Sequence, residues 1–175
     1  MTSRQPSVAE ADPVRGVAAA EFRQAMGRFL TGVAVVTSCG PEGPHGTTVS
    51  SLASVSLEPP MLLICLGRLS SGAEVIRRAG TFTVNILGRE QSELAGWFAT
   101  TGRPRGAAGF AGVAHRTGGH GAPVLTGAVA HLECRVVQDV HAGDHIIFIG
   151  EVGRIGCAEA ADPLAYHQGR FLTLG

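Results

Sequence analysis

The sequence predicts a mainly β protein of one domain, in which an antiparallel sheet closes into a barrel and short helices flank it. Six runs of residues are rich in β-branched side chains and are bounded by glycine or proline. A turn containing Ala142 and Gly143 joins the two longest runs, which is typical of an antiparallel hairpin. At 175 residues the chain has the length of a single domain, and six or seven such strands usually close on themselves.

The chain opens with a polar stretch, residues 1–16, that contains two prolines and is typical of a flexible tail. We expect the folded domain to span residues 17–175. Ala18, Phe22, Met26 and Phe29 recur at spacings of three and four residues, which predicts an amphipathic helix over 17–30.

Strands are expected where the helical period stops and β-branched residues accumulate. They span 33–39, 47–56, 61–67, 81–87, 127–140 and 144–156. Residues 70–79 and 89–100 begin with polar residues and end near a glycine, so they are predicted to be helices that cover an end of the sheet. Residues 101–123 contain seven glycines and two prolines, which predicts a long flexible loop of the kind that often carries function.

Charge and composition exclude several classes of partner. Fourteen Lys and Arg residues balance fourteen Asp and Glu residues, so no overall positive field attracts nucleic acid or an anionic membrane. No apolar run approaches the roughly 18 residues of a membrane span, and the N-terminus lacks the apolar segment of a signal peptide. The four cysteines form no CxxC pair, which is typical of reduced thiols. We therefore expect a cytoplasmic protein.

The sequence lacks the common motifs for dinucleotide binding, metal binding and covalent catalysis. Gly119 and Gly121 begin like a dinucleotide fingerprint, but Val124 stands where its third glycine belongs. His141 and His145 are separated by a predicted hairpin turn and have no acidic third ligand at a suitable spacing, so no metal site is expected. The sequence contains no GxSxG, and no cysteine has an activating neighbour.

Hydroxyl side chains gather on one predicted strand. The stretch GTTVSSLASVS, residues 46–56, carries six of them between apolar residues. Neutral hydroxyl and amide donors can hold a phosphate and a polar heterocycle without burying a fixed charge. Arg68, Ser70 and Ser71 follow the strand at 61–67 at the start of a predicted helix, a position that favours anions. On these residues alone an alternative stays open, in which the serines face solvent or only cap the helix.

Longer stretches, taken in their order along the chain, resemble a known family. The resemblance rests on six segments: FRQAMGRFLTGVAVVTS, HGTTVSSLASVSLEPPMLLICLGRLSSGAEVI, FTVNIL, GAPVLTGAVAHLECRVV, AGDHIIFIGEV and PLAYHQGRF. They are similar to the short-chain flavin reductases that supply reduced flavin to two-component monooxygenases, from about Glu21 to Phe171. The resemblance implies an FMN-binding split β-barrel and a homodimer. It also implies that NADH or NADPH reduces FMN or FAD, which then serves a separate flavin-dependent oxygenase.

The resemblance also assigns roles to single residues. Along the isoalloxazine ring and ribityl chain it places Thr47, Thr48, Val49, Ser50 and Ser51. Toward the phosphate it places Ser54, Ser70 and Ser71, and Arg68 is a further candidate phosphate donor. The helix start reads RLSSGAEV, whereas relatives often have an Asn or Thr near these serines. It makes His145 the catalytic residue beside the nicotinamide. The C-terminal segment that closes over NADH or NADPH contains Tyr166, His167, Gln168 and Arg170.

Two other functions are known alternatives for the same type of barrel. A flavin-binding sensor or carrier would keep the hydroxyl-rich strand, but it would not need His145 or the segment around Tyr166. An oxidase of a phosphorylated pyridine would need several additional basic residues, and the predicted strands offer few. The sequence therefore favours the reductase and keeps the non-enzymatic flavin binder as the alternative.

Overall fold

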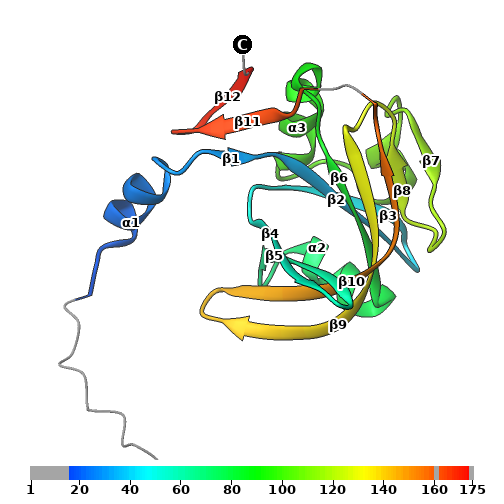
Figure 1. Cartoon of the computed structure of the whole chain (residues 1–175), viewed down its shortest axis with the longest axis horizontal. Helices are drawn as coiled ribbons and strands as arrows, with labels where there is room; N and C mark the ends of the chain where they lie inside the picture. The colour runs from blue at the N-terminus through cyan, green and yellow to red at the C-terminus, as the bar shows by residue number, and fades with distance from the viewer. Residues whose placement is uncertain (1–15, 160–161, 174–175) are drawn as a thin grey trace, which may run out of the picture.

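The computed structural model describes residues 16–159 and 162–173, and it is built mainly from antiparallel strands (Figure 1). The strands are β1 (Thr31–Gly32), β2 (Ala34–Gly40), β3 (Gly43–Val49), β4 (Leu52–Leu57), β5 (Pro60–Gly67), β6 (Thr81–Ile86), β7 (His115–Thr117), β8 (Pro123–Leu125), β9 (Ala130–Ala142), β10 (His145–Cys157), β11 (Leu164–His167) and β12 (Arg170–Thr173). The helices are α1 (Ala19–Met26), α2 (Ser71–Ala79) and α3 (Ser92–Ala99), with the 3₁₀ segments η1 (Arg89–Gln91) and η2 (Gly106–Phe110). Within the described residues no helix is long and apolar enough to cross a membrane.

Seven strands form the main sheet, in the order β3-β2-β6-β9-β10-β5-β4. The β9–β10 hairpin and the antiparallel pairing are as predicted. The strand predicted over 47–56 is wrong, because the chain leaves β3 after Val49 and begins β4 at Leu52, on the opposite edge of the sheet. The break therefore puts Ser50 and Ser51 at a crossing between two edges instead of inside a strand.

The first helix differs from the amphipathic helix predicted over 17–30. It ends at Met26, where Gly27 caps it, and it buries no residue. Phe22, Met26 and Phe29 are 61%, 51% and 66% exposed. The apolar spacing that predicted a core-facing helix is present, but its apolar side chains have no core to enter within this chain. Figure 1 shows α1 standing apart from the main sheet.

Strand β2 contacts two hydrophobic clusters because both of its faces are covered. Ala34 and Val36 join Phe148 in the cluster that the main sheet and α2 enclose. Val35 points the other way and packs with Phe98 of α3 in the second cluster. A strand buried on both faces holds its neighbour β3 firmly, and β3 carries the threonines predicted to bind flavin.

The predicted long loop, residues 101–123, is more ordered than its glycines suggested. It contains η2 and β7, and its end is tied to buried polar groups. Asn85 is fully buried and accepts a hydrogen bond from the Leu125 amide at 2.8 Å. Glu133, also buried, accepts one from the Gly119 amide at 2.6 Å. Buried polar groups need such partners, so the network fixes this segment over the sheet.

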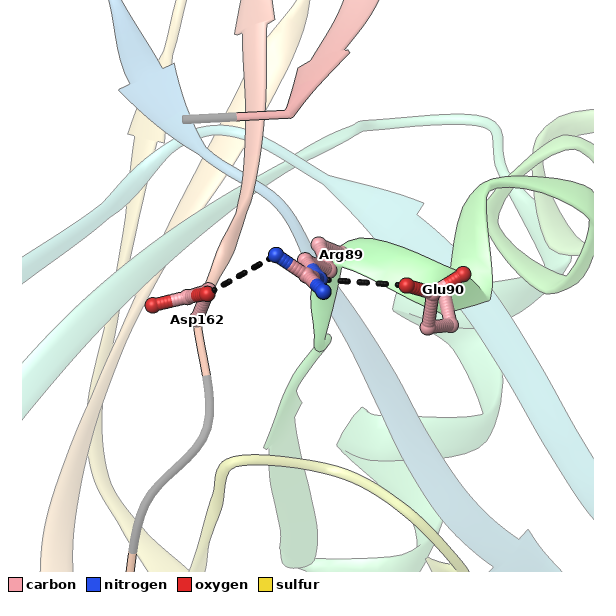
Figure 2. Close-up of polar contacts among 3 residues, drawn as sticks. All are labelled: Arg89, Glu90 and Asp162. Carbon is pink, nitrogen blue, oxygen red and sulfur yellow. Dashed lines mark hydrogen bonds and ion pairs between the residues drawn. The ribbon is translucent and has the colours of Figure 1, made fainter. Parts of the chain in front are cut away.

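The C-terminal strands form a small sheet with β1, in the order β1-β11-β12. Arg89 ties down the point where the chain enters β11, because its guanidinium lies 3.1 Å from Asp162 and 3.0 Å from Glu90 (Figure 2). The backbone repeats this link, since the Arg89 amide donates to the Asp162 carbonyl at 2.9 Å. These contacts position the turn between β11 and β12, which carries the residues predicted to bind the nicotinamide nucleotide.

Candidate active site

Two cavities contain most of the predicted site residues. The larger, here called the α1 cleft, has a volume of about 1000 Å³ and lies between α1, the segment 50–53, β5 and the β11–β12 turn. Its lining includes Phe22, Arg23, Met26, Arg28, Phe29, Thr31, Ser50, Ser51, Leu63, Tyr166 and Gln168. The cleft thus brings two residues predicted to hold the flavin ring, Ser50 and Ser51, to the same space as Tyr166 and Gln168 of the nucleotide segment.

The Ser51 side chain replaces part of the broken strand ladder. Its Oγ donates to the Cys65 carbonyl at 2.9 Å and accepts from the Cys65 amide at 3.2 Å. One hydroxyl therefore satisfies both backbone groups of β5 that a continuous β4 would have paired. This contact fixes the break between β3 and β4, and it leaves the exposed Ser50 as the hydroxyl that faces the cleft.

Two features of the α1 cleft suit a ligand that is flat and partly polar. Thr31 Oγ1 is buried in its lining and has no hydrogen-bond partner in the protein. Tyr166 pairs with Thr31 across the β1–β11 ladder, and its ring packs on Phe171 with the ring centres 5.6 Å apart. A buried hydroxyl without a partner is costly, so a bound group that reaches it would gain a hydrogen bond.

The smaller cavity, here called the arginine pocket, has a volume of about 330 Å³. It lies between β3, the start of α2 and the segment after α3, and its polar lining includes His45, Thr47, Ser70, Ser71, Arg103 and Arg105. Ser70 caps α2, because its Oγ accepts a hydrogen bond from the Ala73 amide at 3.2 Å. The predicted phosphate residues Ser70 and Ser71 therefore line the same pocket as Thr47. They lie at the N-terminus of α2, and a helix N-terminus favours anions.

The electrostatics of the arginine pocket favour an anion. Arg103 lies over the Phe98 ring at 4.8 Å, and it donates through Nη1 to the Trp97 carbonyl at 3.2 Å and through Nη2 to the Gly46 carbonyl at 2.5 Å. Its Nε is buried and has no partner. The pKa of His45 is lowered, first by burial and then by the positive charges of Arg103 and Arg105. No carboxylate is among the described residues that line this pocket.

Several predicted flavin residues lie outside both cavities. Thr48 turns toward α3, where its Oγ1 donates to the Ala95 carbonyl at 2.7 Å. Val49 is buried in the main hydrophobic cluster. Ser54 is exposed on β4, and Arg68 is exposed beside the β9–β10 turn, where its amide donates to the Asp144 carbonyl at 2.8 Å. Strand alternation sends the side chains of adjacent residues to opposite faces, so the side chains of Thr48 and Val49 point away from both cavities.

His145 begins β10 and lies at the tip of the hairpin, half exposed. Its Nδ1 is 2.8 Å from Asp144 Oδ1. That contact, and the charge of His145, lower the pKa of Asp144, to which Arg23 adds a smaller effect. The hairpin tip lies beside the end of β5, because His145 pairs with Gly67 and the Arg68 amide donates to the Asp144 carbonyl. His145 itself is not among the residues that line either cavity.

The remaining predicted nucleotide residues lie at the turn from β11 to β12. Gln168 adopts a left-handed backbone conformation, with φ of 48°, and its amide donates to the Gly27 carbonyl at 2.9 Å. His167 pairs with Arg170 across the turn. Gln168 thus contacts the end of α1 directly, while His167 and Arg170 lie beside the cleft instead of in its lining.

Sequence reasoning missed His45, Arg103, Arg105 and Thr31. The first three come from two segments that meet only in the fold, β3 and the glycine-rich segment after α3. A usable signal was present, since TGRPRG places two arginines in a segment already expected to carry function. Thr31 lies between a predicted helix and a predicted strand, and nothing in its neighbours marks it.

Comparisons with known proteins show the family of the chain. Residues 26–175 match the family described as "Flavin reductase like domain". The NADH-dependent FMN reductase of Streptomyces nodosus subsp. asukaensis is 43% identical over 88% of this chain and 84% of its own length. The reductase component of the 4-nitrophenol 4-monooxygenase/4-nitrocatechol 2-monooxygenase of Rhodococcus opacus is also 43% identical, over 87% of this chain and 79% of its own.

A solved structure extends the similarity to the whole fold. The NADH:FAD oxidoreductase of Streptomyces globisporus C-1027 superposes with a TM-score of 0.85 at 37% identity, covering 97% of this chain and 99% of the other. This confirms the predicted antiparallel split β-barrel with short flanking helices. The chain belongs to the flavin reductase-like domain family.

Proposed function

We propose that this protein is an NADH- or NADPH-dependent flavin reductase that reduces FMN or FAD and supplies the reduced flavin to a separate monooxygenase. The relatives named above are NADH-dependent reductases and the reductase component of a monooxygenase. The observation that carries the proposal is that one cavity, the α1 cleft, brings the predicted flavin residues Ser50 and Ser51 to the same space as Tyr166 and Gln168 of the predicted nucleotide segment.

The two cavities suit the two ends of a flavin. Thr47 lines the arginine pocket and Ser50 lines the α1 cleft. Two residues, Thr48 and Val49, lie between them, and the three steps from residue 47 to residue 50 span at most about 10 Å. A flavin with its phosphate beside Arg103 and its ring beside Ser50 would lie along this segment. When bound, the flavin accepts a hydride from the nicotinamide, which is chemistry that no side chain can supply.

The residues of this chain bind and orient the two reactants. Arg103, Arg105, Ser70 and Ser71 hold the phosphate, while the break fixed by Ser51 presents Ser50 to the ring. Tyr166 and Gln168 form the opposite wall of the α1 cleft and hold the nicotinamide nucleotide there. Confining both rings to one cleft replaces a bimolecular encounter by a positioned one, which can contribute several kcal/mol to catalysis. His145, held by Asp144 at 2.8 Å, binds the nucleotide from the hairpin tip.

We also propose that the chain is a homodimer. Strands β5 and β10 are apolar on both faces: Ile146 and Phe148 are buried in the core, whereas Ile147, Ile149 and Leu63 form a half-buried row on the outer face. An antiparallel sheet with one solvated face usually carries polar residues there. The exposed side chains of α1 add to this outer apolar surface, and a second copy of the chain would cover both.

The dimer is tested by sedimentation at micromolar concentration, where a mass of twice the 18.0 kDa of one chain is expected. Replacing Phe22 by serine should weaken the dimer without lowering the melting temperature of the monomer, because Phe22 is 61% exposed in one chain. A single species of 18.0 kDa from the unaltered protein would contradict the proposal.

The reductase activity is tested by anaerobic mixing of the protein with flavin and either NADH or NADPH. We expect the visible absorbance of the oxidised flavin to disappear at a rate that saturates with the nucleotide. If flavin binds but its absorbance does not change with either nucleotide, the protein is a flavin carrier or sensor and the reductase proposal is wrong.

A further inference from the structure

Membership of the family does not decide which flavin this chain uses. The relatives include both an FMN reductase and an FAD reductase at similar identity. FMN ends in a phosphomonoester, whereas in FAD the same phosphate is one half of a diphosphate that continues to adenosine. The charge and size of the cavity around this phosphate can therefore distinguish the two flavins.

The arginine pocket concentrates positive charge on one point. Arg103 and Arg105 line it together with His45 and the start of α2, and none of its described lining residues is acidic. The side chains of Arg105 and His45 make no hydrogen bond or ion pair with any residue that the structure describes. A phosphomonoester carries a charge of roughly −1.5 to −2 at neutral pH, while each phosphate of a diphosphate diester carries only a single charge. This pocket is thus matched to a terminal phosphate.

The cavity that adjoins the arginine pocket inside the protein is too small for a second phosphate with its nucleoside. The adjoining cavity has a volume of about 50 Å³, which admits only a few water molecules. Its charged lining residues are Glu42, Glu74, Arg78 and Arg105, with His45 at the boundary. Arg78 pairs with Glu74 at 2.8 Å, and Glu42 lines this cavity but not the arginine pocket, so a second phosphate here would meet a carboxylate.

The wall between this cavity and the segment after α3 is backbone packed on backbone. A Cβ added to Gly106 would lie 2.6 Å from the Glu42 carbonyl oxygen, and one added to Gly43 would lie 3.5 Å from the Gly106 Cα. Gly106 also has φ of 60°, a conformation that other residues rarely adopt. The two segments are therefore in direct backbone contact at this point, with no side chain between them.

We propose that the arginine pocket selects FMN over FAD by recognising a terminal phosphomonoester. The inference rests on the proposed function, because it assigns the phosphate end of the flavin to this pocket. In FAD, adenosine monophosphate is attached to this phosphate and would have to extend from the pocket toward solvent. The phosphate would then carry a single charge, which weakens its match to the two arginines.

Equilibrium binding of FMN, FAD and riboflavin to the full chain, without nucleotide, tests this selection. We expect FMN to bind at least about tenfold more tightly than FAD, the effect of one charged hydrogen bond, and riboflavin to bind weakly. Arg105→Ala should reduce FMN affinity about tenfold, FAD affinity less and riboflavin affinity not at all. Arg77→Ala is the matched control, because Arg77 lies on α2 but pairs with Asp139, and it should leave all three affinities unchanged.

The outcomes separate this inference from the proposed function. Equal affinities for FMN and FAD, or tighter FAD binding, would overturn the selection of FMN even if NADH still reduced both flavins. An equal loss of all three affinities in Arg105→Ala would also overturn it, because the arginine would then act on the fold rather than on the phosphate. Failure of the unaltered protein to bind or reduce any flavin would overturn both.

Discussion

The arginine pocket and the α1 cleft are built in different ways. The pocket is bounded by β3, α2 and α3, and β3 is held by a strand buried on both faces. The cleft takes one wall from α1, a helix that buries no residue of its own. Within one copy of the chain, a cavity with walls in the core can select a ligand by shape and charge, whereas a cavity with one wall outside the core can admit and release one. The difference suits a phosphate that is held in place while a nucleotide comes and goes.

The largest expected effect comes from removing Arg103, the cation in the lining of the arginine pocket whose Nε is buried. Arg103→Ala should reduce FMN affinity by about a hundredfold, because charged hydrogen bonds contribute roughly 1.5 to 3 kcal/mol each. Riboflavin affinity is the control, and Arg103→Lys should retain part of the FMN binding. If riboflavin and FMN lose affinity equally, Arg103 serves only to pack against Phe98, over which it lies at 4.8 Å.

The next effect concerns the tip of the β9–β10 hairpin. His145→Ala should lower kcat/KM for NADH by about one to two orders of magnitude, with flavin affinity little changed, because the lost hydrogen bond contributes roughly 0.5 to 3 kcal/mol. Steady-state kinetics and flavin titration on the same preparation measure both. A mutant that binds NADH and flavin equally poorly and melts earlier would show that His145 only secures the hairpin through its 2.8 Å contact with Asp144.

A smaller effect distinguishes two serines, Ser70 and Ser54, to which the family resemblance assigns the same role. Ser70→Ala removes a helix cap, which costs about 1 kcal/mol and should lower the melting temperature by roughly 2–4 °C for a chain of this length. It should also reduce FMN affinity a few-fold, because Ser70 lines the arginine pocket. Ser54→Ala should change neither quantity, since Ser54 is exposed on β4. A loss of FMN affinity in Ser54→Ala would restore the role that the family resemblance predicted for it.

The smallest effect is a pH dependence. The pKa of His45 is lowered below 6.5 in the folded protein, first by burial and then by Arg103 and Arg105. The unfolded chain therefore binds a proton at a higher pH than the folded chain, so stability should fall as the pH drops below 6.5 toward the folded pKa. His45→Gln should flatten the melting temperature over this range. An unchanged pH profile in the variant would show that His45 is not the group responsible.

Much of the fold followed from local patterns. The β9–β10 hairpin, α2 and β6 lie close to their predicted bounds, because alternation, turn residues and caps all act within a few positions. The break after Val49 did not follow, because β4 is set by pairing with β5 and by the Ser51 contacts with Cys65. The exposure of the apolar face of α1 could not be predicted either. Its apolar residues have the same spacing whether they pack on this chain or on another.

The candidate site was predictable where residues share one segment and not where distant segments meet. Ser50, Ser51, Ser70 and Ser71 were found because they lie in recognisable stretches, and they line the two cavities. The arginines at 103 and 105 reach His45 only through the packing of η2 on β3, which no local pattern specifies. Residues 1–15, predicted as a tail, lie outside the described residues.

A crystal structure of the FMN complex tests the central claim most directly. We predict that the phosphate lies within hydrogen-bond distance of Arg103 and the Ser70–Ser71 segment, and that the ring lies against Ser50 and Ser51 in the α1 cleft. Arg23 and Arg28 also line the cleft and could attract a phosphate there. A phosphate bound between those two arginines, with the arginine pocket holding only water, would contradict the assignment of the two cavities to the two ends of one flavin.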